Sequence, residues 1–304
     1  MAVGEFELID RYFRRPLCAR DDVLVGIGDD GAVLRIAAGQ RLVSTVATLG
    51  TAAWDASGGD PARLGHDAMA IALNRLAAVG AQPAWATLAL TLTDAEEDWL
   101  AAFSDALFAL ATRYRVALVG GDTTRGPFCA TLMGHGLVGN DDRQARREIH
   151  VGDGLYVSGP LAAGRALTRS TPSTIRVELG QWIRTHGGTA ADMSEGVAAA
   201  LTALLADAPL GATIARARLP LIPGLQPPVD DEDSWSGRLN QRGDMELCFT
   251  LPPEQHEDMA AYAAGLQIPA TQLATVDDSC VIAFLDAEGR TLRLPSGQRG
   301  DLPS

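Results

Sequence analysis

The sequence predicts an α/β fold divided into two halves. Its 304 residues suffice for one large domain or two ordinary ones, and 47% of them are hydrophobic, which allows a substantial core. Strand-like and helix-like hydrophobic patterns alternate in both halves. A polar, arginine-rich segment at 141–147 separates the halves, so we expect one domain at 1–148 and a second at 149–304.

The N-terminal half contains two clear helix starts. Asp60 and Pro61 offer an N-cap followed by proline at the first helical position. Thr93 and Glu96 form a capping box that opens a second long helix. The elements expected here are a helix over 4–13, strands over 23–27, 34–36 and 42–45 (the last two as a hairpin or meander), a helix from 61 to about 80, a strand over 84–92, a helix from about 93, and strands over 115–119 and 129–138.

The stretch with the most informative chemistry is Leu118–Gly126. Its apolar strand is expected to end in a turn at Gly120-Gly121-Asp122, followed by two threonines and Arg125. Adjacent glycines let a backbone approach a large charged group, or turn where a side chain would clash. An acid, hydroxyls and an arginine are the components of a phosphate and metal site. A tight turn without a ligand is the alternative interpretation.

The C-terminal half also alternates strands and helices. Its tail is polar and is expected to be loose. The elements expected here are strands over 155–158, 190–193, 245–251 and 280–285, helices over 160–169, 175–186, about 197–206 and 254–266, a surface loop over 226–237, and the loose tail at 295–304.

Composition excludes several classes of function. The net charge of −13 argues against a general nucleic-acid surface. No apolar run approaches the roughly 18 residues of a membrane span, and the first residues lack the pattern of a secretory signal, so we expect a cytoplasmic protein without membrane contact. Four scattered cysteines without a Cys-x-x-Cys pair argue against a disulfide framework or a zinc site.

Every one of the 25 basic residues is arginine. The chain therefore has no lysine for a P-loop or for Schiff-base chemistry. Any phosphate clamp must use arginine, magnesium or backbone N–H groups.

Four segments resemble the thiamine-monophosphate kinase family, which belongs to a superfamily with aminoimidazole ribonucleotide synthetase and selenophosphate synthetase. The segments are Gly4–Phe13, Gly26–Asp30, Gly120–Gly126 and Glu246–Thr250. The resemblance covers nearly the whole chain. It implies two α/β (α+β) domains of synthetase/kinase-like fold with mixed sheets flanked by helices, and a homodimer whose N-terminal sheets pair. It also implies that an N-terminal domain binds ATP and several magnesium ions, that the C-terminal domain completes the cleft, and that the γ-phosphate passes to thiamine monophosphate.

Several positions match the family's functional residues. The residues implied to hold magnesium are Asp30, Asp122, Asp192 and Glu195, the last keeping an aspartate's charge on a longer side chain. The residues implied to contact ATP are Gly120, Gly121, Arg146 and Ser194. The match identifies no catalytic residue. For the three aspartates, the alternative is a solvated turn residue or a helix cap.

Four positions depart from the family. Ala47 and Arg75 stand where the family has metal-binding aspartates, Trp54 where it has a substrate-contacting histidine, and Gly243 where it has an acid that contacts the acceptor. Losing two carboxylates is expected to weaken multi-magnesium binding by roughly several kcal/mol. Arg75 either reaches the phosphates in place of a magnesium ion or is a solvated helix residue.

Three hypotheses remain open from the sequence. The first is an ATP- and magnesium-dependent phosphotransferase or ligase with a rebuilt site for a small-molecule acceptor. The second is an authentic thiamine-monophosphate kinase with a reduced metal set. The third is a catalytically inactive homodimer that binds a nucleotide, or nothing, and acts as a scaffold.

Overall fold

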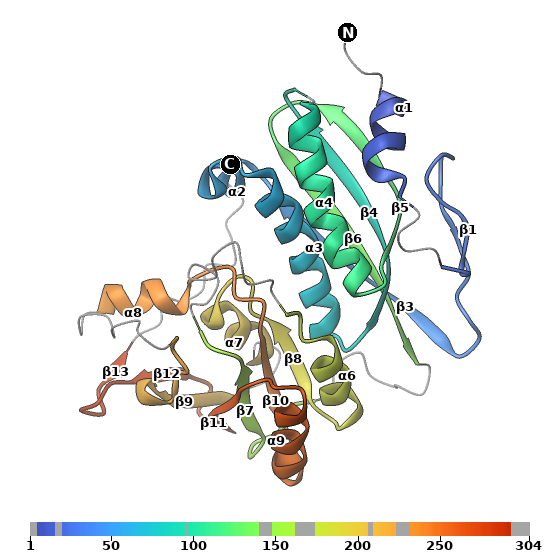
Figure 1. Ribbon diagram of the computed structural model, residues 1–304. Helices are drawn as coiled ribbons and strands as arrows, with labels where there is room; N and C mark the ends of the chain where they lie inside the picture. The colour runs from blue at the N-terminus through green and yellow to red at the C-terminus, as the bar shows by residue number, and fades with distance from the viewer. Residues whose placement is uncertain are drawn as a thin grey trace. The chain divides into compact units, whose positions relative to one another are not determined.

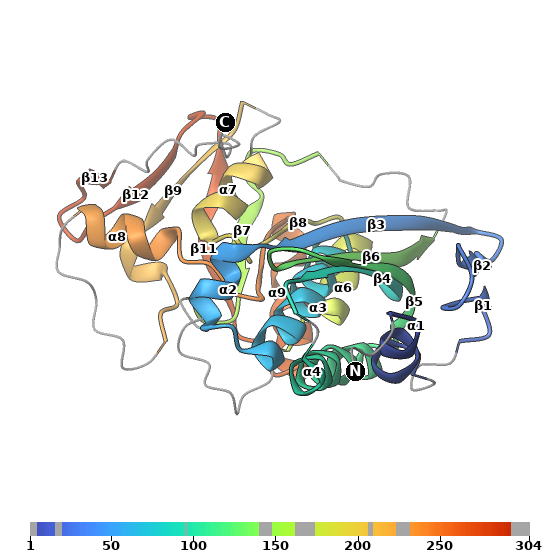
Figure 2. The same cartoon turned by 90° about the horizontal axis from the view of Figure 1, so that it is seen from above.

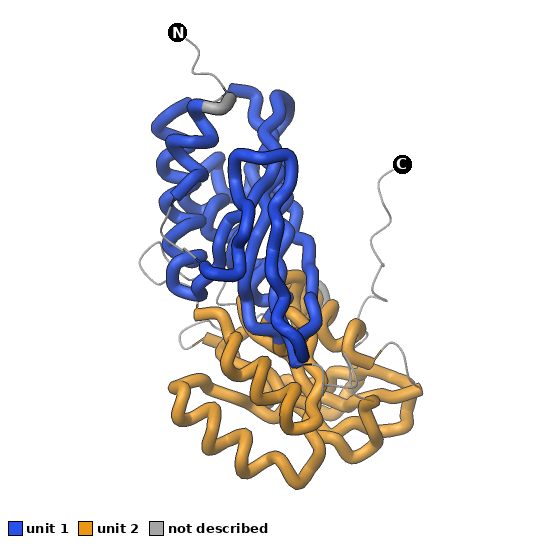
Figure 3. Tube along the Cα trace, turned by 90° about the vertical axis from the view of Figure 1, so that its right-hand side faces the viewer, with its two compact units in different colours: residues 1–76, 81–143 blue, residues 77–80, 144–304 orange. Residues whose placement is uncertain are grey.

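The chain forms two compact units in the computed structural model. One unit comprises residues 1–76 and 81–143, and the other comprises residues 77–80 and 144–304 (Figure 3). The boundary after residue 148 stays a prediction. The structure describes residues 5–15, 20–94, 96–139, 148–161, 174–205, 209–222 and 232–292.

The N-terminal unit is a four-stranded sheet with helices on one face (Figures 1 and 2). The strand order is β3-β6-β4-β5, in which β4 and β5 are parallel and the other pairs are antiparallel. Its elements are α1 (Glu5–Leu8), a π-helical turn η1 (Ile9–Phe13), β1 (Val23–Val25), β2 (Val33–Leu34), β3 (Gln40–Leu49), α2 (Thr51–Ser57), α3 (Pro61–Ala78), β4 (Gln82–Leu92), α4 (Glu97–Arg113), β5 (Ala117–Arg125) and β6 (Cys129–Gly139).

The two long helices of this unit follow from their sequence patterns. The backbone N–H of Ala62 donates to the Asp60 carboxylate at 3.1 Å, which confirms the predicted N-cap of α3. The apolar stripe of α4 is buried as expected, with Leu100, Phe103 and Leu107 at 1% exposure or less. Gly65 of α3 lies so close to α4 that a β-carbon there would be 2.1 Å from the Phe103 carbonyl oxygen. The helices therefore pack at a distance that only glycine permits.

The hairpin β1–β2 forms a separate two-stranded sheet. Val23, Ala32 and Leu34 pack against a buried cluster that contains Trp85 of β4. The Trp85 indole N–H donates to the Asp22 carboxylate at 3.0 Å. Hydrogen bonds from Arg20 are the main reason why the pKa of Asp22 lies below its ordinary value, although partial burial opposes the shift. The hairpin is thus fixed to β4 by apolar packing and by an ionised carboxylate.

Three predictions for the N-terminal unit are wrong. The strand containing Gly120 does not turn at Asp122, because β5 continues to Arg125 in parallel pairing with β4. The expected hairpin between strands at 34–36 and 42–45 does not form, since β2 pairs with β1 and β3 pairs with β6 along its whole length. Helix α4 begins at Glu97, and its N-cap Glu96 makes no side-chain capping bond, so no capping box starts at Thr93.

The C-terminal unit is built on a seven-stranded mixed sheet in the order β13-β12-β9-β11-β7-β10-β8. Its strand β10 is buried at every position, as a strand covered on both faces should be. Its elements are β7 (Gly154–Ser158), α6 (Val177–Thr185), β8 (Thr189–Asp192), α7 (Val197–Leu205), β9 (Gly211–Ala215), a 3₁₀ turn η3 (Arg216–Arg218), α8 (Glu232–Leu239), β10 (Leu247–Leu251), a 3₁₀ turn η4 (Pro253–Gln255), α9 (His256–Gly265), β11 (Ala270–Asp277), β12 (Ile282–Leu285) and β13 (Thr291–Leu292).

Several elements of this unit were not expected. Strands β9, β11 and β13 are additional to the predicted ones, and the predicted loop at 226–237 is helical from Glu232 onward as α8. Short strands with small or polar residues, such as Gly211–Ala215, carry little periodic signal by themselves. The helix expected over 160–169, the first part of the predicted loop and the tail at 295–304 lie outside the described residues, apart from residues 160 and 161.

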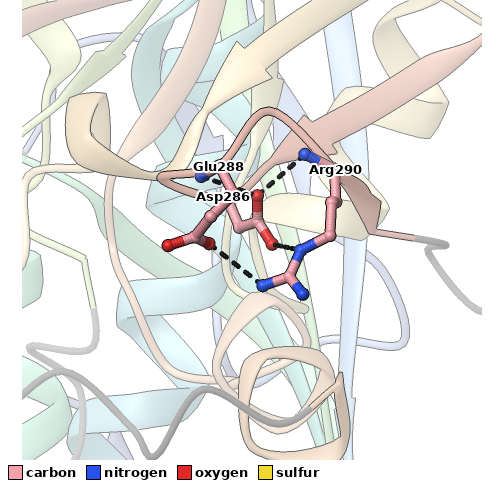
Figure 4. Close-up of polar contacts among 3 residues, drawn as sticks. All are labelled: Asp286, Glu288 and Arg290. Carbon is pink, nitrogen blue, oxygen red and sulfur yellow. Dashed lines mark hydrogen bonds and ion pairs between the residues drawn. The ribbon is translucent and has the colours of Figure 1, made fainter.

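A charged turn joins β12 to β13. The Asp286 carboxylate accepts hydrogen bonds from the backbone N–H groups of Glu288 (3.0 Å) and Arg290 (2.8 Å) and from the Arg290 guanidinium at 2.7 Å (Figure 4). Arg290 also donates to Glu288 at 3.0 Å. An aspartate that caps its own turn in this way fixes the reversal without an apolar contact.

Across the described residues, no helix is long and apolar enough to cross a membrane.

We expect Gly65→Ala to destabilise the protein by about 2 kcal/mol, because the added methyl group forces α3 away from α4. Urea unfolding measures the change. Gly265→Ala is the matched control: a β-carbon at this position in α9 meets nothing within 4 Å, so the same substitution should stabilise by about 0.5 kcal/mol. Equal stabilities of the two variants would contradict the packing argument.

Candidate functional site

A cavity of about 370 Å³ lies in the N-terminal unit and brings together several of the predicted ligand residues. Its polar lining includes the predicted Asp30, Gly120, Gly121 and Asp122. Segments nearly one hundred residues apart in sequence therefore meet at one place. The remaining lining residues are Ile9, Asp10, Phe13, Arg14, Ile27, Gly28, Asp29, Leu88, Leu90, Leu118 and Thr123.

The cavity has both apolar side chains and several carboxylate side chains in its lining. Leu88, Leu90 and Leu118 supply apolar surface from the sheet, whereas Asp30 and Asp122 are exposed side chains that also line the cavity. A pocket with apolar walls and a few convergent polar groups is the usual form of a small-molecule site. The arrangement suits a ligand that is organic at one end and carries cations or polar groups at the other.

The two glycines of β5 play different structural roles. Gly121 has φ +155°, and a β-carbon there would lie 1.8 Å from the Leu88 carbonyl oxygen of β4. Gly120 has ordinary space around it, because a β-carbon there would have Thr87 Cγ2 as its nearest neighbour, at 3.9 Å. The strand pair is irregular between Ala86 and Thr87, opposite these glycines. Gly121 is therefore required by the sheet itself, whereas the absence of a side chain at Gly120 leaves its backbone open to a ligand.

The acidic turn places its carboxylates by local hydrogen bonding. Asp29 accepts a hydrogen bond from the backbone N–H of Asp30 at 2.8 Å, and Ile27 forms an isolated bridge with Asp29. The turn follows directly from the hairpin strand β1. The packing of the hairpin on Trp85 therefore also determines where Asp29 and Asp30 lie.

The donor set fits magnesium only in part. Asp29, Asp30 and Asp122 offer oxygen atoms, which magnesium prefers. Across the described ranges, however, no three carboxylate, imidazole or thiolate side chains gather closely enough to hold a metal ion. Magnesium commonly uses one or two protein carboxylates and takes its other ligands from water and substrate phosphates. These residues are thus suited to a magnesium ion that arrives with a phosphorylated ligand.

Ala47 and Arg75 lie on facing elements. Ala47 of β3 is 1% exposed, and Arg75 of α3 donates a hydrogen bond through Nη1 to the carbonyl oxygen of Val46. The guanidinium therefore binds the β3 backbone next to the residue that replaces the expected aspartate. Arg75 is not a fully solvated helix residue.

Trp54 takes part in an aromatic cluster. Its ring stacks on Trp99 at 5.8 Å between centroids and contacts Phe128 at 5.2 Å, and Trp99 in turn stacks on Phe103 at 5.1 Å. Gly59 approaches the Trp54 ring so closely that a β-carbon would lie 2.9 Å from it. The side chain at this position thus packs α2 against α4 in place of a polar contact to a ligand.

In the C-terminal unit, the predicted residues follow β8. Asp192 ends the strand and accepts hydrogen bonds from the backbone N–H of Ser194 at 3.1 Å and from its hydroxyl group. Glu195 forms an ion pair with Arg242 at 3.0 Å, with both side chains substantially exposed. Such an exposed pair contributes little to stability. It does hold the Glu195 carboxylate next to a cation.

The loop with Gly243 is fixed to the same segment. The Gly243 N–H donates to the Ser194 carbonyl at 2.8 Å, and its φ of +101° favours glycine. Three residues later, Glu246 is buried and accepts two hydrogen bonds from Arg176 (2.6 and 2.7 Å) and one from Ser158 (2.6 Å). This buried network joins β7, β10 and the start of α6. It anchors the loop without supplying a carboxylate at position 243.

The predicted site residues thus fall into two groups. Asp30, Gly120, Gly121 and Asp122 line one cavity in the N-terminal unit. Asp192, Ser194 and Glu195 are neighbours in the C-terminal unit. Arg146 lies outside the described residues.

Sequence reasoning did not assign three polar lining residues of the cavity, namely Asp10, Arg14 and Asp29. Asp29 had a signal, because it belongs to the same Gly-Asp-Asp turn as Asp30. Asp10 and Arg14 had none, since Arg14 follows the end of the helix predicted over 4–13, and their ion pair at 2.9 Å is a feature of the structure. Nothing in the sequence indicated that this pair faces the acidic turn.

Comparisons with known proteins give a consistent result. Residues 28–138 match the family model described as AIR synthase related protein, N-terminal domain. Thiamine-monophosphate kinase from Escherichia coli (strain K12) is 38% identical over 315 aligned residues, which cover 96% of this chain and 97% of that protein. Thiamine-monophosphate kinase from Haemophilus influenzae is 32% identical, with 92% of this chain and 91% of that protein covered.

Solved structures agree with this match. A crystal structure of thiamine-monophosphate kinase from Stenotrophomonas maltophilia K279a superimposes with a TM-score of 0.80 at 36% identity, covering 93% of this chain and 97% of that one. A hydrogenase maturation protein HypE in complex with ATP has a TM-score of 0.72 at 17% identity, covering 97% and 96%. The second similarity concerns the fold alone.

We expect Gly121→Ala to destabilise the protein by at least about 2 kcal/mol, because its methyl group would collide with the backbone of β4 at an unfavourable φ. Gly120→Ala is the neighbouring control and should change the free energy of unfolding by less than about 1 kcal/mol. Denaturant unfolding of both variants measures this difference. A Gly121→Ala variant as stable as the parent would show that the β5 geometry is adaptable.

Proposed function

Because the chain belongs to the thiamine-monophosphate kinase family, we propose that it is an ATP- and magnesium-dependent phosphotransferase or ligase whose small-molecule acceptor is not thiamine monophosphate. The observation that carries this proposal is the cavity in which Asp30, Gly120, Gly121 and Asp122 meet. The retained residues belong to the nucleotide side. Among the altered residues, Trp54 and Gly243 belong to the acceptor side, whereas Ala47 and Arg75 reduce the metal set.

On the nucleotide side, the backbone at Gly120 is the open approach to phosphate groups, since no side chain shields it. Asp30 and Asp122 would hold magnesium at the border of the cavity. Bound magnesium neutralises the charge that develops on the transferring phosphoryl group. In the C-terminal unit, Asp192, Glu195 and Ser194 are proposed to contribute to the metal and nucleotide contacts, together with Arg146.

The metal set is reduced. Within the described residues, Asp29, Asp30 and Asp122 do not form a closed cage, and Arg75 occupies the surroundings of Ala47 as a bound cation. Magnesium is therefore proposed to bind tightly only with the nucleotide, whose phosphates supply the missing oxygen ligands. Arg75 supplies positive charge near β3 without a metal ion.

On the acceptor side, two positions favour an acceptor other than thiamine monophosphate. Trp54 is committed to packing with Trp99 and Phe128, so it offers no polar contact of the kind expected from histidine. Gly243 has no carboxylate, and its neighbour Arg242 brings positive charge to the loop. An acceptor that needs an acidic partner at this position would therefore lose it.

The two other functions each have a supporting observation. Identity of 38% over almost the full length of a thiamine-monophosphate kinase favours the authentic kinase with a reduced metal set. The absence of a three-ligand metal group from the described part of the chain favours a non-catalytic nucleotide-binding scaffold. One set of measurements separates all three.

We expect calorimetric titration to show ATP binding that is strengthened at least about tenfold by magnesium, because Asp30 and Asp122 hold an ion that also binds the phosphates. Asp122→Ala should abolish this strengthening. Asp278→Ala, an exposed aspartate of the C-terminal unit, is the control and should bind like the parent. ATP binding that ignores magnesium in the parent would contradict the metal assignment, and no binding would favour the scaffold.

Turnover then distinguishes the two enzymatic functions. With ATP and magnesium present, thiamine monophosphate should not be phosphorylated at a rate above that of the Asp122→Ala variant. Phosphorylation of thiamine monophosphate would overturn the rebuilt acceptor site and establish the authentic kinase.

A homodimer is part of the proposal. No described helix of the N-terminal unit covers the second face of its sheet (Figure 2), and Leu42, Val46 and Met133 are 40–48% exposed there. Ser44 and Thr48 lie two residues before and after Val46 on β3, so all three share one face of the sheet. Burial lowers the pKa of His135 on β6, which keeps that ring uncharged near neutral pH. A mostly uncharged, partly apolar sheet face suits pairing with its own copy.

We expect the protein to be dimeric by size-exclusion chromatography with light scattering, and Val46→Arg to shift it to a monomer by placing two charges in the interface. Val281→Arg is the control. It introduces the same charge at a 54% exposed position of the other unit and should leave the mass unchanged. A Val46→Arg variant that remains dimeric would place the interface elsewhere.

A further inference from the structure

Arg14 is the basic side chain that lines the cavity beside four carboxylates. Of the described lining residues, Asp10, Asp29, Asp30 and Asp122 are acidic and Arg14 alone is basic. Carboxylates that converge on one site repel each other until a cation arrives. The Arg14 guanidinium is therefore expected to offset part of this repulsion while no cation is bound.

A π-helical turn determines where Arg14 lies. The turn spans Ile9–Phe13, and the backbone N–H of Arg14 donates to the Ile9 carbonyl at 2.9 Å, five residues back. Such turns are rare and often occur at functional sites. The residue at its end is displaced from an ordinary helical position. Its guanidinium donates to the Ile27 carbonyl oxygen in the acidic turn at 2.9 Å and pairs with Asp10 at 2.9 Å.

The Arg14 guanidinium lies in contact with the backbone of the acidic turn, at a glycine whose φ favours that residue. Gly28 has φ +119°, and a β-carbon there would lie 1.9 Å from Arg14 Nη2. The guanidinium thus lies directly on the backbone between Ile27 and Asp29. Arg14 therefore contacts the turn through both this approach and its hydrogen bond to the Ile27 carbonyl.

We propose that Arg14 is a positioning residue that holds the Gly28–Asp30 turn in its binding conformation before the magnesium nucleotide arrives. This inference rests on the proposed function, in which Asp30 holds magnesium. Arg14 contacts the carbonyl of Ile27 and the Asp10 carboxylate, so its charge is partly neutralised away from the metal ligands. Repulsion between Arg14 and a bound cation is thereby reduced, and orientation of the turn is its proposed contribution.

The experiment compares Arg14→Met, Arg14→Lys and a matched control in the full chain. Methionine keeps much of the apolar stem and removes the donors, whereas lysine keeps the charge with a single donor head. Arg11→Met is the control. Arg11 lies on the same π-helical turn, but its guanidinium pairs with Glu97 of α4 at 2.6 Å and does not line the cavity.

Two measurements report on the inference. The first is the ratio of the ATP dissociation constants without and with magnesium, from calorimetry. We expect this ratio to fall about tenfold in Arg14→Met, as for other residues that orient metal ligands, and to recover partly in Arg14→Lys. The melting temperature without ligand should stay close to that of the parent, because the Arg14 side chain is about half exposed.

The second measurement is hydrogen exchange of the segment 23–34 without any ligand. Exchange should accelerate in Arg14→Met and stay unchanged in Arg11→Met. This readout does not require nucleotide binding. If the parent protein fails to bind magnesium nucleotide, the proposed function is contradicted. The exchange comparison still tests the role of Arg14 in that case, because it is made without ligand. Unchanged exchange in Arg14→Met, or a magnesium ratio that rises, would overturn the positioning role.

Discussion

The packing of the hairpin β1–β2 on Trp85 is the contact on which the N-terminal cavity depends. The hairpin forms its own two-stranded sheet, so side chains rather than main-chain pairing with the larger sheet hold it in place. The indole of Trp85 supplies both a large apolar surface and a hydrogen bond to Asp22. The acidic turn lies in the loop that joins the two strands of this hairpin. The packing of the hairpin on Trp85 thus helps to determine how far the carboxylates of the turn lie from Asp122.

The strand β5 imposes a second constraint. It must lie close to β4 for Asp122 to reach the border of the cavity, and Gly121 makes this possible because no β-carbon fits against Leu88. A glycine pair that suggested a turn is in fact part of an irregular strand. The same residues therefore serve the sheet and the proposed nucleotide site, and the structural and functional interpretations of the motif are compatible.

Much of the fold followed from the sequence, because long periodic segments such as α3 and α4 have strong apolar stripes and, at Asp60, a recognisable cap. Strand partners did not follow. The pairing of β3 with β6 joins residues about ninety positions apart, and local patterns carry no information on it. At the site, Asp30 and Asp122 could be predicted from motifs, whereas Arg14 could not. Its proposed role depends on a π-helical turn and on a hydrogen bond to the Ile27 carbonyl, which only the three-dimensional arrangement reveals.

β5 is an edge strand of its sheet. An edge strand presents backbone N–H and C=O groups with which a strand of another chain can pair, and this is a common route to aggregation. On β5, the exposed Asp122 and Arg125 lie along this edge, and the acidic turn lies close to it at the cavity. Charged residues in such a place oppose the approach of a foreign strand. Asp122, which is proposed to bind magnesium, thus also protects the sheet against uncontrolled extension, and neutralising it would affect solubility as well as binding.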